Sequence, residues 1–113
     1  MSIYNKMVKA IDNCNVNDYL ELLHDDYVFI RHQSNQKVSK SDWIPVVTGM
    51  FNAMKEGKLN FEENRCIYEN KDILVMHNIG NFPDNTKEAI MVVHTILDGK
   101  IIKTESGATR IDK

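Results

Sequence analysis

The first half of the chain, from Ser2 to about Lys58, carries hydrophobic residues three and four positions apart, which is the spacing of one helix face. Three helices are predicted from this pattern. The first starts at the N-terminal serine, and the second is short and begins near Val16. The third follows the polar run Ser39 to Asp42, holds Pro45 in its first turn and ends at Gly57.

From Leu59 to Ile111 the pattern changes to the alternation that is typical of strands. The pairs Asn70-Lys71 and Asp98-Gly99 mark tight turns, and the segment Phe82 to Thr86 is a longer loop that contains a proline. Four consecutive antiparallel strands are therefore predicted, at about 59–69, 72–82, 87–97 and 100–110.

An aromatic and β-branched run from Tyr27 to His32 predicts one further strand between the second and third helices. The polar segment Gln33 to Lys37 is expected to form a loop. Helices gathered on one face of an antiparallel sheet define the α+β class. We therefore expect residues 1–113 to form a single domain, with N-terminal helices packed on the sheet.

The composition of the chain mainly excludes classes of protein. Of 113 residues, 42% are hydrophobic, and 16 acidic against 14 basic residues give a net charge of −2. No Lys and Arg cluster marks a nucleic-acid surface, and no apolar run approaches the roughly 20 residues of a membrane span. Cys14 and Cys66 lack a metal-binding spacing, so we expect buried thiols in a reduced compartment. Without the apolar core of a signal peptide, the predicted location is cytoplasmic.

Three local sequences occur in an order that resembles a known superfamily. Tyr19 to Phe29 combines a short helix, an acidic break and a strand, Ile67 to Val75 forms a hairpin, and Leu97 to Ile102 turns into the last strand. Together with the order of the predicted elements, they resemble the nuclear-transport-factor-2-like superfamily over nearly the whole chain. The resemblance implies a curved, cystatin-like half-barrel with a pocket between the helices and the sheet.

This superfamily includes ketosteroid isomerases, scytalone dehydratase, polyketide cyclases, limonene epoxide hydrolase and proteins that only bind, so the fold implies no single function. Ketosteroid isomerisation needs a carboxylate base, and a tyrosine and a protonated aspartate that hold the oxyanion. Counting along the chain places Arg31, Met7 and Met91 at these three positions. The sequence therefore predicts that this activity is absent, and that Arg31 and Met91 face the cavity.

Arg31 is the candidate anchor of a ligand. An arginine stays charged, and in a half-apolar pocket it binds a carboxylate or phosphate through two parallel hydrogen bonds. The alternative is a strand-end arginine in water or paired with an acid such as Glu63. Further lining is expected where the third helix covers the sheet, although the aromatic residues there also suit a packed core. The predicted lining residues are Tyr27, Phe29, Arg31, Trp43, Phe51, His77, Met91 and Thr104.

The register of the last hairpin predicts the outer face. With Asp98-Gly99 as a two-residue turn, Met91 shares the pocket face with Thr104, and the residues that alternate with them face outward. An apolar outer face predicts a homodimer. The predicted interface comprises Ile90, Val92, His94, Ile96 and Ile101.

His77 is left open between the two faces because a single bulge would reverse it. If His77 and His94 both faced the pocket, they would suit acid–base chemistry like that of scytalone dehydratase; the alternative is a core or interface role. The four histidines share no metal-binding spacing, so neither a metal nor a cofactor is expected.

Two functions remain open. The first is a pocket for a partly apolar metabolite, anionic if Arg31 anchors it, with or without an isomerase, dehydratase or cyclase step that needs no cofactor. The second is a non-enzymatic, homodimeric binding or interaction module that uses the same fold as a scaffold.

Overall fold

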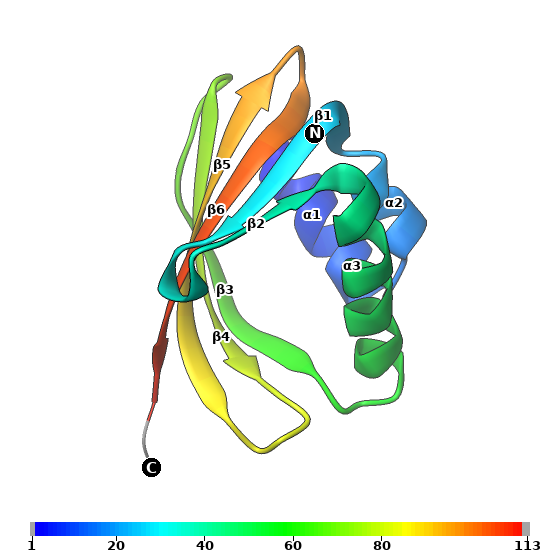
Figure 1. The fold of residues 1–113 in the computed structure, drawn as a ribbon, viewed down its shortest axis with the longest axis vertical. Helices are drawn as coiled ribbons and strands as arrows, with labels where there is room; N and C mark the ends of the chain where they lie inside the picture. The colour runs from blue at the N-terminus through cyan, green and yellow to red at the C-terminus, as the bar shows by residue number, and fades with distance from the viewer. Residues whose placement is uncertain (1, 112–113) are drawn as a thin grey trace.

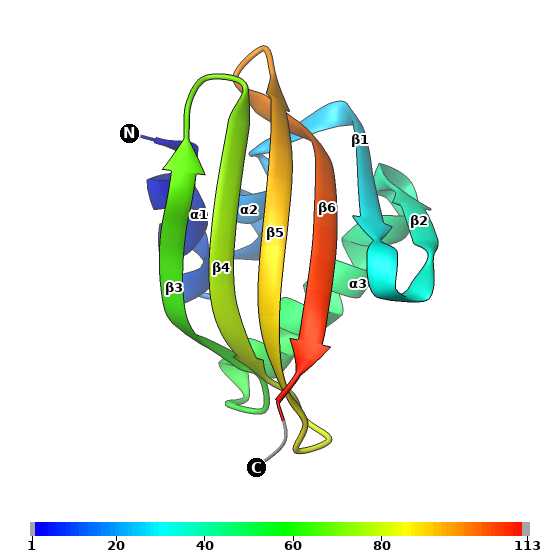
Figure 2. The same cartoon turned by 90° about the vertical axis from the view of Figure 1, so that its left-hand side faces the viewer.

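The structure, a computed structural model, describes residues 2–111 and has helices on one face of a curved sheet (Figure 1). After a quarter turn, the convex face of the sheet faces the viewer and the helices lie behind it (Figure 2). This arrangement confirms the predicted α+β class. The helical elements are α1 (Ile3–Asp12), α2 (Val16–Leu20), α3 (Lys40–Lys55) and a short 3-10 turn, η1 (His32–Ser34).

Within residues 2–111 the strands form a six-stranded sheet in the order β2-β1-β6-β5-β4-β3. The strands β3 to β6 form the antiparallel meander that the turn signals predict. β1 joins the meander through a parallel pairing with β6, so the sheet is mixed and not wholly antiparallel. The strand bounds are β1 (Leu23–Arg31), β2 (Gln36–Ser39), β3 (Asn60–Glu69), β4 (Ile73–Asn81), β5 (Lys87–Leu97) and β6 (Lys100–Arg110).

The segment that was expected to be a polar loop contains a strand. Asn35 takes the left-handed conformation, with φ of 52°, and reverses the chain so that β2 pairs antiparallel with β1. β2 lies at the edge of the sheet, and an edge strand tolerates polar residues because one of its sides faces water. Its composition is therefore that of a loop, although its backbone is paired.

The ends of α3 follow from local chemistry. Ser39 caps the helix, and its Oγ accepts a hydrogen bond from the Asp42 backbone N–H at 3.4 Å. Gly57, with φ of +74°, ends the helix as predicted. Pro45 lies in the second turn and not the first, because the helix already begins at Lys40. One backbone hydrogen bond is therefore missing there.

One bulge in the β5–β6 hairpin decides which side chains face the helices. The Asp98-Gly99 turn pairs Ile96 with Ile101, but the next residue of β5, Thr95, pairs with Lys103. β6 therefore carries one extra residue at this point. Because successive side chains of a strand point to opposite faces, the extra residue reverses the relation between the two strands beyond it.

The predicted faces of β5 are consequently wrong. Ile90, Val92 and His94 lie on the concave face, against the helices, whereas the prediction placed them in a dimer interface. Ile96 and Ile101 are buried in the core between the layers. Thr104 does face the helices, as predicted, but the bulge places His94 opposite it and turns Met91 outward.

The hydrophobic core lies between the helices and the concave face, and its fully buried side chains include Tyr27, Leu74 and Ile101. Both cysteines are free, but Cys14 is half-buried and Cys66 is exposed on the edge strand β3, so the prediction of buried thiols is wrong. Among the described residues, no helix is both long enough and apolar enough to cross a membrane.

Candidate functional site

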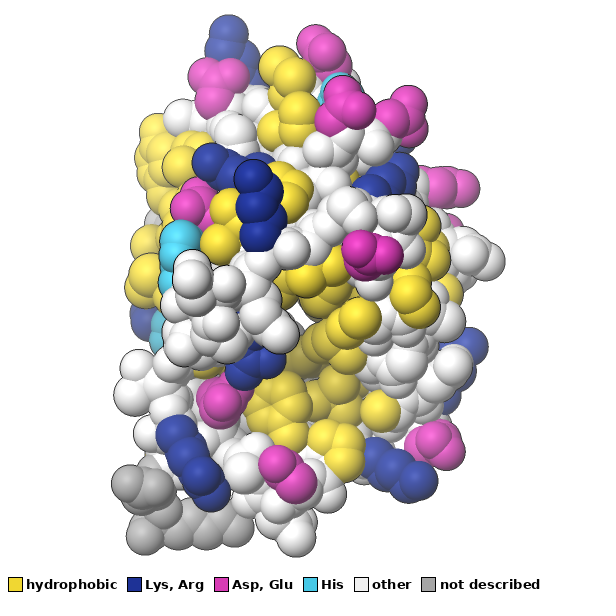
Figure 3. All heavy atoms as spheres, viewed as in Figure 1, with side chains coloured by type: hydrophobic (Ala, Val, Ile, Leu, Met, Phe, Trp, Pro, Cys, Tyr) yellow, Lys and Arg dark blue, Asp and Glu magenta, His cyan; other side chains and the backbone are white. Residues whose placement is uncertain are grey.

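A cavity of about 460 Å³ lies between the concave face of the sheet and the helices α1 and α3. Figure 3 shows a hollow in this region that is lined mainly by hydrophobic side chains, with charged side chains at its rim. Its volume falls within the range of small-molecule sites, roughly 300–1,000 Å³. The sheet supplies one wall of the cavity, and α1 and α3, with Tyr19 of α2, supply the other.

The helix wall is apolar. Phe29 of β1 and Trp43 of α3 stack at one end of the cavity, with ring centroids 4.1 Å apart and planes 7° from parallel. Methionine side chains along the rest of this wall are unbranched and adapt to the shape of what they contact. The helices contribute Met7, Ile11, Tyr19, Trp43, Val46, Val47, Met50, Phe51 and Met54.

The predicted lining residues divide into three groups. Phe29, Arg31, Trp43, Phe51 and Thr104 line the cavity. Tyr27 is only 2% exposed and belongs to the core beneath it. His77 and Met91 pair with each other across β4 and β5 on the convex face, where Met91 is 48% exposed. The placement of Met91 in the lining is wrong because it depends on the register that the bulge reverses. The face of His77 was left open, and its pairing with Met91 puts it on the convex face, outside the lining in which it was included.

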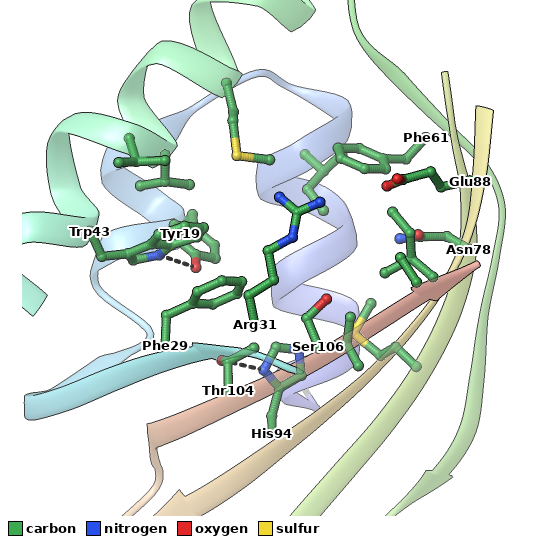
Figure 4. A pocket seen from close by; sticks show the side chains of 18 of the residues that line it. Tyr19, Phe29, Arg31, Trp43, Phe61, Asn78, Glu88, His94, Thr104 and Ser106 are labelled. Carbon is green, nitrogen blue, oxygen red and sulfur yellow. Dashed lines mark hydrogen bonds between the residues drawn. The ribbon is translucent and has the colours of Figure 1, made fainter. Parts of the chain in front are cut away.

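Arg31 carries its charge into the cavity. Its guanidinium points away from β1 toward the helix wall (Figure 4). In the amide orientation that satisfies both side chains, the Gln33 oxygen accepts hydrogen bonds from Arg31 Nε and Nη2 at 2.8 and 3.2 Å. Within residues 2–111 Arg31 forms no ion pair, with Glu63 or with any other acid. The guanidinium is therefore held in place by a neutral partner.

His94 lies on the sheet wall of the cavity and is 5% exposed. Its Nδ1 and the Thr104 hydroxyl form a hydrogen bond of 2.8 Å across the β5–β6 pair. Burial lowers the pKa of His94 to about 4, because the charged ring would lose its hydration. The imidazole is therefore neutral at pH 7.

Asn78 adds an acceptor to the same wall. Its Nδ2 donates to Asn64 Oδ1 at 3.0 Å, but its buried Oδ1 has no hydrogen-bond partner among the described residues. The side chain is 8% exposed and lines the cavity. A buried carbonyl without a donor costs about 1–3 kcal/mol, so this oxygen favours a ligand or water that supplies one.

The sequence prediction did not include Asn78, Ser106 or Glu88, which also line the cavity, and it placed His94 on the wrong face. The available signal was alternation along β4, where Asn78 follows Leu74 and Met76 at intervals of two. That signal groups residues on a face but does not tell which face is concave.

Comparison with known proteins identifies the family. Residues 1–99 match the model of the SnoaL-like domain. The chain belongs to this family. A search of curated proteins finds no match. The family match agrees with the predicted resemblance to the nuclear-transport-factor-2-like superfamily. Two of the similar solved structures are themselves described as nuclear-transport-factor-2-like proteins.

Two solved structures illustrate how far the likeness reaches. A candidate ketosteroid isomerase from Kribbella flavida superposes with a TM-score of 0.73 at 13% identity, over 96% of this chain and 76% of that one. A nuclear-transport-factor-2-like protein of unknown function from Cytophaga hutchinsonii gives 0.72 at 14% identity, over 94% and 96%. At such identities the SnoaL-like chain shares a fold with them, and no activity follows.

The SnoaL-like cavity also differs from the ketosteroid-isomerase pattern in detail. Arg31 and Met7, which occupy the expected positions of the base and the tyrosine, both line the cavity. Met91, at the expected position of the second acid, lies outside it. Among residues 2–111, no group of three His, Cys, Asp or Glu side chains is placed to hold a metal ion.

Proposed function

We propose that this SnoaL-like protein binds a partly apolar, anionic small molecule in the cavity, with Arg31 as the anchor of the anion. The observation that supports this most directly is the guanidinium, which lies in a cavity of about 460 Å³ and has no acidic partner among the described residues. A carboxylate or phosphate would complete it through paired hydrogen bonds.

The arrangement around Arg31 favours an exchange of partners. Gln33 holds Nε and Nη2 with one neutral amide oxygen, and the amide nitrogen reaches the Ser106 backbone oxygen at 3.2 Å. A ligand carboxylate that replaced the amide would face the guanidinium with the opposite charge and with two oxygens in place of one, so two parallel hydrogen bonds would gain Coulombic attraction. The apolar helix wall would take the rest of the ligand.

Catalysis would need an acid or base beside the ligand. Besides Arg31, the titratable side chains lining the cavity among the described residues are Tyr19, Glu88 and His94. An isomerase, dehydratase or cyclase step without a cofactor would pass its proton through one of these three. They are the residues to substitute once a ligand is known.

The anchor is tested with two probes of the same shape, 4-tert-butylbenzoate and its neutral amide. Trp43 is the only tryptophan of the chain and lines the cavity, so its fluorescence reports binding. We expect benzoate to bind more tightly than the amide, and Arg31→Met to weaken benzoate about tenfold while leaving the amide unchanged. Arg31→Lys should recover only part of the loss.

The matched control is Arg65→Met, which removes the same charge from an exposed position on β3. It should leave both affinities unchanged. If Arg31→Met and Arg65→Met weaken benzoate equally, the effect is one of net charge, and Arg31 is not the anchor.

We also propose that the protein forms a homodimer through the convex face. The supporting observation is the row of apolar side chains at the centre of that face. Ile90 and Val92 line the cavity, so alternation turns Met91 and Val93 outward, and Val93 pairs with Val75 of β4. The surface differs in its residues from the predicted one and is less uniformly apolar, because Met91 pairs with His77 of β4 and Val93 pairs with Glu105 of β6.

A further inference from the structure

The Gln33 amide fills a polar corner of the cavity between Arg31 and β6. Gln33 belongs to the turn η1, which follows β1 directly, and its side chain lines the cavity although the residue is exposed. Its oxygen accepts from Arg31 Nε and Nη2 at 2.8 and 3.2 Å, and its nitrogen donates to the Ser106 backbone oxygen at 3.2 Å. These three contacts show which polar groups a ligand in the same place would have to satisfy.

Both partners fix the orientation of this amide. A guanidinium can only donate hydrogen bonds, and a backbone carbonyl oxygen can only accept them. The amide therefore turns its oxygen toward Arg31 and its nitrogen toward Ser106. These two residues are direct partners in the parallel pairing of β1 with β6, so their polar groups lie close together (Figure 4). The corner is complete only when it holds an acceptor for the guanidinium and a donor for the carbonyl.

A simple carboxylate satisfies only the first of these two groups. When ionised, both of its oxygens accept hydrogen bonds and neither donates. If it replaced the Gln33 amide, the Ser106 backbone oxygen would lose its donor and would face an oxygen of like partial charge. Ser106 is 8% exposed, so little water is available to replace that donor. A better ligand would carry a donor next to its carboxylate.

We propose that the cavity binds a 2-hydroxy acid, whose carboxylate takes Arg31 from Gln33 and whose hydroxyl donates to the Ser106 backbone oxygen. The carboxylate supplies the charge that the amide lacks, and the hydroxyl on the neighbouring carbon supplies the donor that a carboxylate lacks. The apolar substituent of that carbon would lie against the stacked rings of Phe29 and Trp43 and the helix wall. The proposal deepens the binding of an anion at Arg31 and rests on it.

The exchange needs only one side chain to move. Gln33 is exposed, so its amide can turn into water when a ligand takes its place. The turn η1 stays attached to β6, because His32 Nε2 and Glu105 Oε1 lie 3.1 Å apart. Glu105 lies between two lining residues of β6 and so points to the convex face, away from the ligand. Gln33 is therefore a competitor of the ligand and not a part of the wall that holds it.

The hydroxyl preference is tested with three acids of similar shape: 4-tert-butylmandelate, its methyl ether, and the deoxy acid 4-tert-butylphenylacetate. All three carry the carboxylate, but only the first has a hydroxyl to donate. Followed by Trp43 fluorescence, the hydroxy acid should bind roughly fivefold more tightly than either of the others, which is the contribution of one neutral hydrogen bond. One enantiomer should be preferred, because all three groups have fixed partners. Equal affinities for the hydroxy and deoxy acids would overturn the proposal.

The partner of the hydroxyl is tested by the carbon-13 NMR shift of the Ser106 carbonyl, which responds to the hydrogen bonds it accepts. In the ligand-free protein Gln33→Ala removes the amide donor and should move this shift upfield. The hydroxy acid should move it back in the same variant, and the deoxy acid should not. A hydroxy acid that leaves the shift where it was would refute the contact. Ser106→Ala keeps the carbonyl and should keep the preference; its loss there would assign the hydroxyl to the serine side chain instead and refute the proposal.

The role of Gln33 gives a second, independent readout. Gln33→Ala should bind all three acids several-fold more tightly, because no internal amide then competes for Arg31. Weaker binding would mean that Gln33 holds the guanidinium for a ligand at its other N–H groups, and would overturn the exchange.

These outcomes are distinguishable from failure of the anchor. If Arg31→Met weakens all three acids while the wild-type protein binds the hydroxy and deoxy acids equally, the anchor stands and the 2-hydroxy acid is wrong. If Arg31→Met weakens none of them, the anchor fails, and the 2-hydroxy acid fails with it.

Discussion

His94 is the residue whose position contributes most to the character of the cavity, and its burial has a consequence for stability. A histidine that is neutral in the folded state, with a pKa of about 4, but has its ordinary pKa of 6.5 when unfolded makes the unfolded chain bind more protons between these values. Stability from this residue is therefore complete above pH 6.5, and it falls as the pH decreases toward 4.

His94→Asn removes this titration. We expect the free energy of unfolding of the wild-type protein to fall by about 2 kcal/mol more than that of the variant between pH 7 and pH 5. Urea unfolding followed by circular dichroism at several pH values measures both curves. The variant will be less stable at pH 7, so only the change with pH is compared. Parallel curves would show that the ring is already charged, or hydrated, in the folded state.

At the residue scale, the sequence identified those lining residues that the residue type and the predicted element are enough to place. Phe29, Trp43 and Phe51 were expected where the third helix covers the sheet, and Arg31 was expected from its place on the first strand. Asn78 could not be found in this way, because the sequence does not show whether an asparagine in a strand faces the cavity or the solvent. Its role depends on burial, which is a property of the packed layers.

At the scale of elements, the four-strand meander was predictable because alternation and two turn signals agree over fifty residues. The bulge in β6 was not. An extra residue in a strand leaves almost no mark in the sequence, since Ile102 and Lys103 fit a strand in either register. Its effect is nevertheless large, because it exchanges the roles of Met91 and His94.

The end of α3 provides a prediction at the same scale. Gly57 has φ of +74° and Gly49 lies within the helix, and a Cβ at either position would meet no atom within 4 Å. A glycine-to-alanine substitution at either position should therefore change the free energy of unfolding through the backbone conformation alone. We expect Gly57→Ala to destabilise the protein by about 1 kcal/mol and Gly49→Ala to stabilise it by about 0.5–1 kcal/mol.

Chemical denaturation of the three proteins measures these differences, and each variant serves as the control for the other. Opposite signs would follow from left-handed backbone at one glycine and helical backbone at the other. If both variants lost stability equally, the helix would not end at Gly57 in the way the structure shows.

At the scale of the whole molecule, the order of elements carried the prediction. Helix, helix, strand, helix and four strands suffice for the α+β class, and the match to the SnoaL-like family agrees with it. That residues 1–113 form one domain, and that the protein is cytoplasmic, stay predictions. The residues of the convex face could not be deduced, because both faces of β5 carry apolar side chains. The homodimer through that face stays a prediction.

The homodimer is the prediction that concerns the whole molecule. Met91 is 48% exposed near the middle of β5, beside Val93, and a two-fold axis through this face would bring each such residue into the interface twice. Met91→Glu would therefore bury two like-charged carboxylates, at a cost of several kcal/mol. A glutamate on this face of the monomer stays in water and leaves the fold intact.

Sedimentation at micromolar concentration measures the outcome. We expect the wild-type protein to sediment as two chains of 13.1 kDa and Met91→Glu to sediment as one, with unchanged circular dichroism. Thr109→Glu is the control, because Thr109 is exposed near the end of β6, away from the apolar centre, and should remain dimeric. A wild-type monomer at these concentrations would contradict the homodimer. The apolar side chains of β4 and β5 on the convex face would then be exposed to water and shielded only by one another, as single surface hydrophobic residues commonly are.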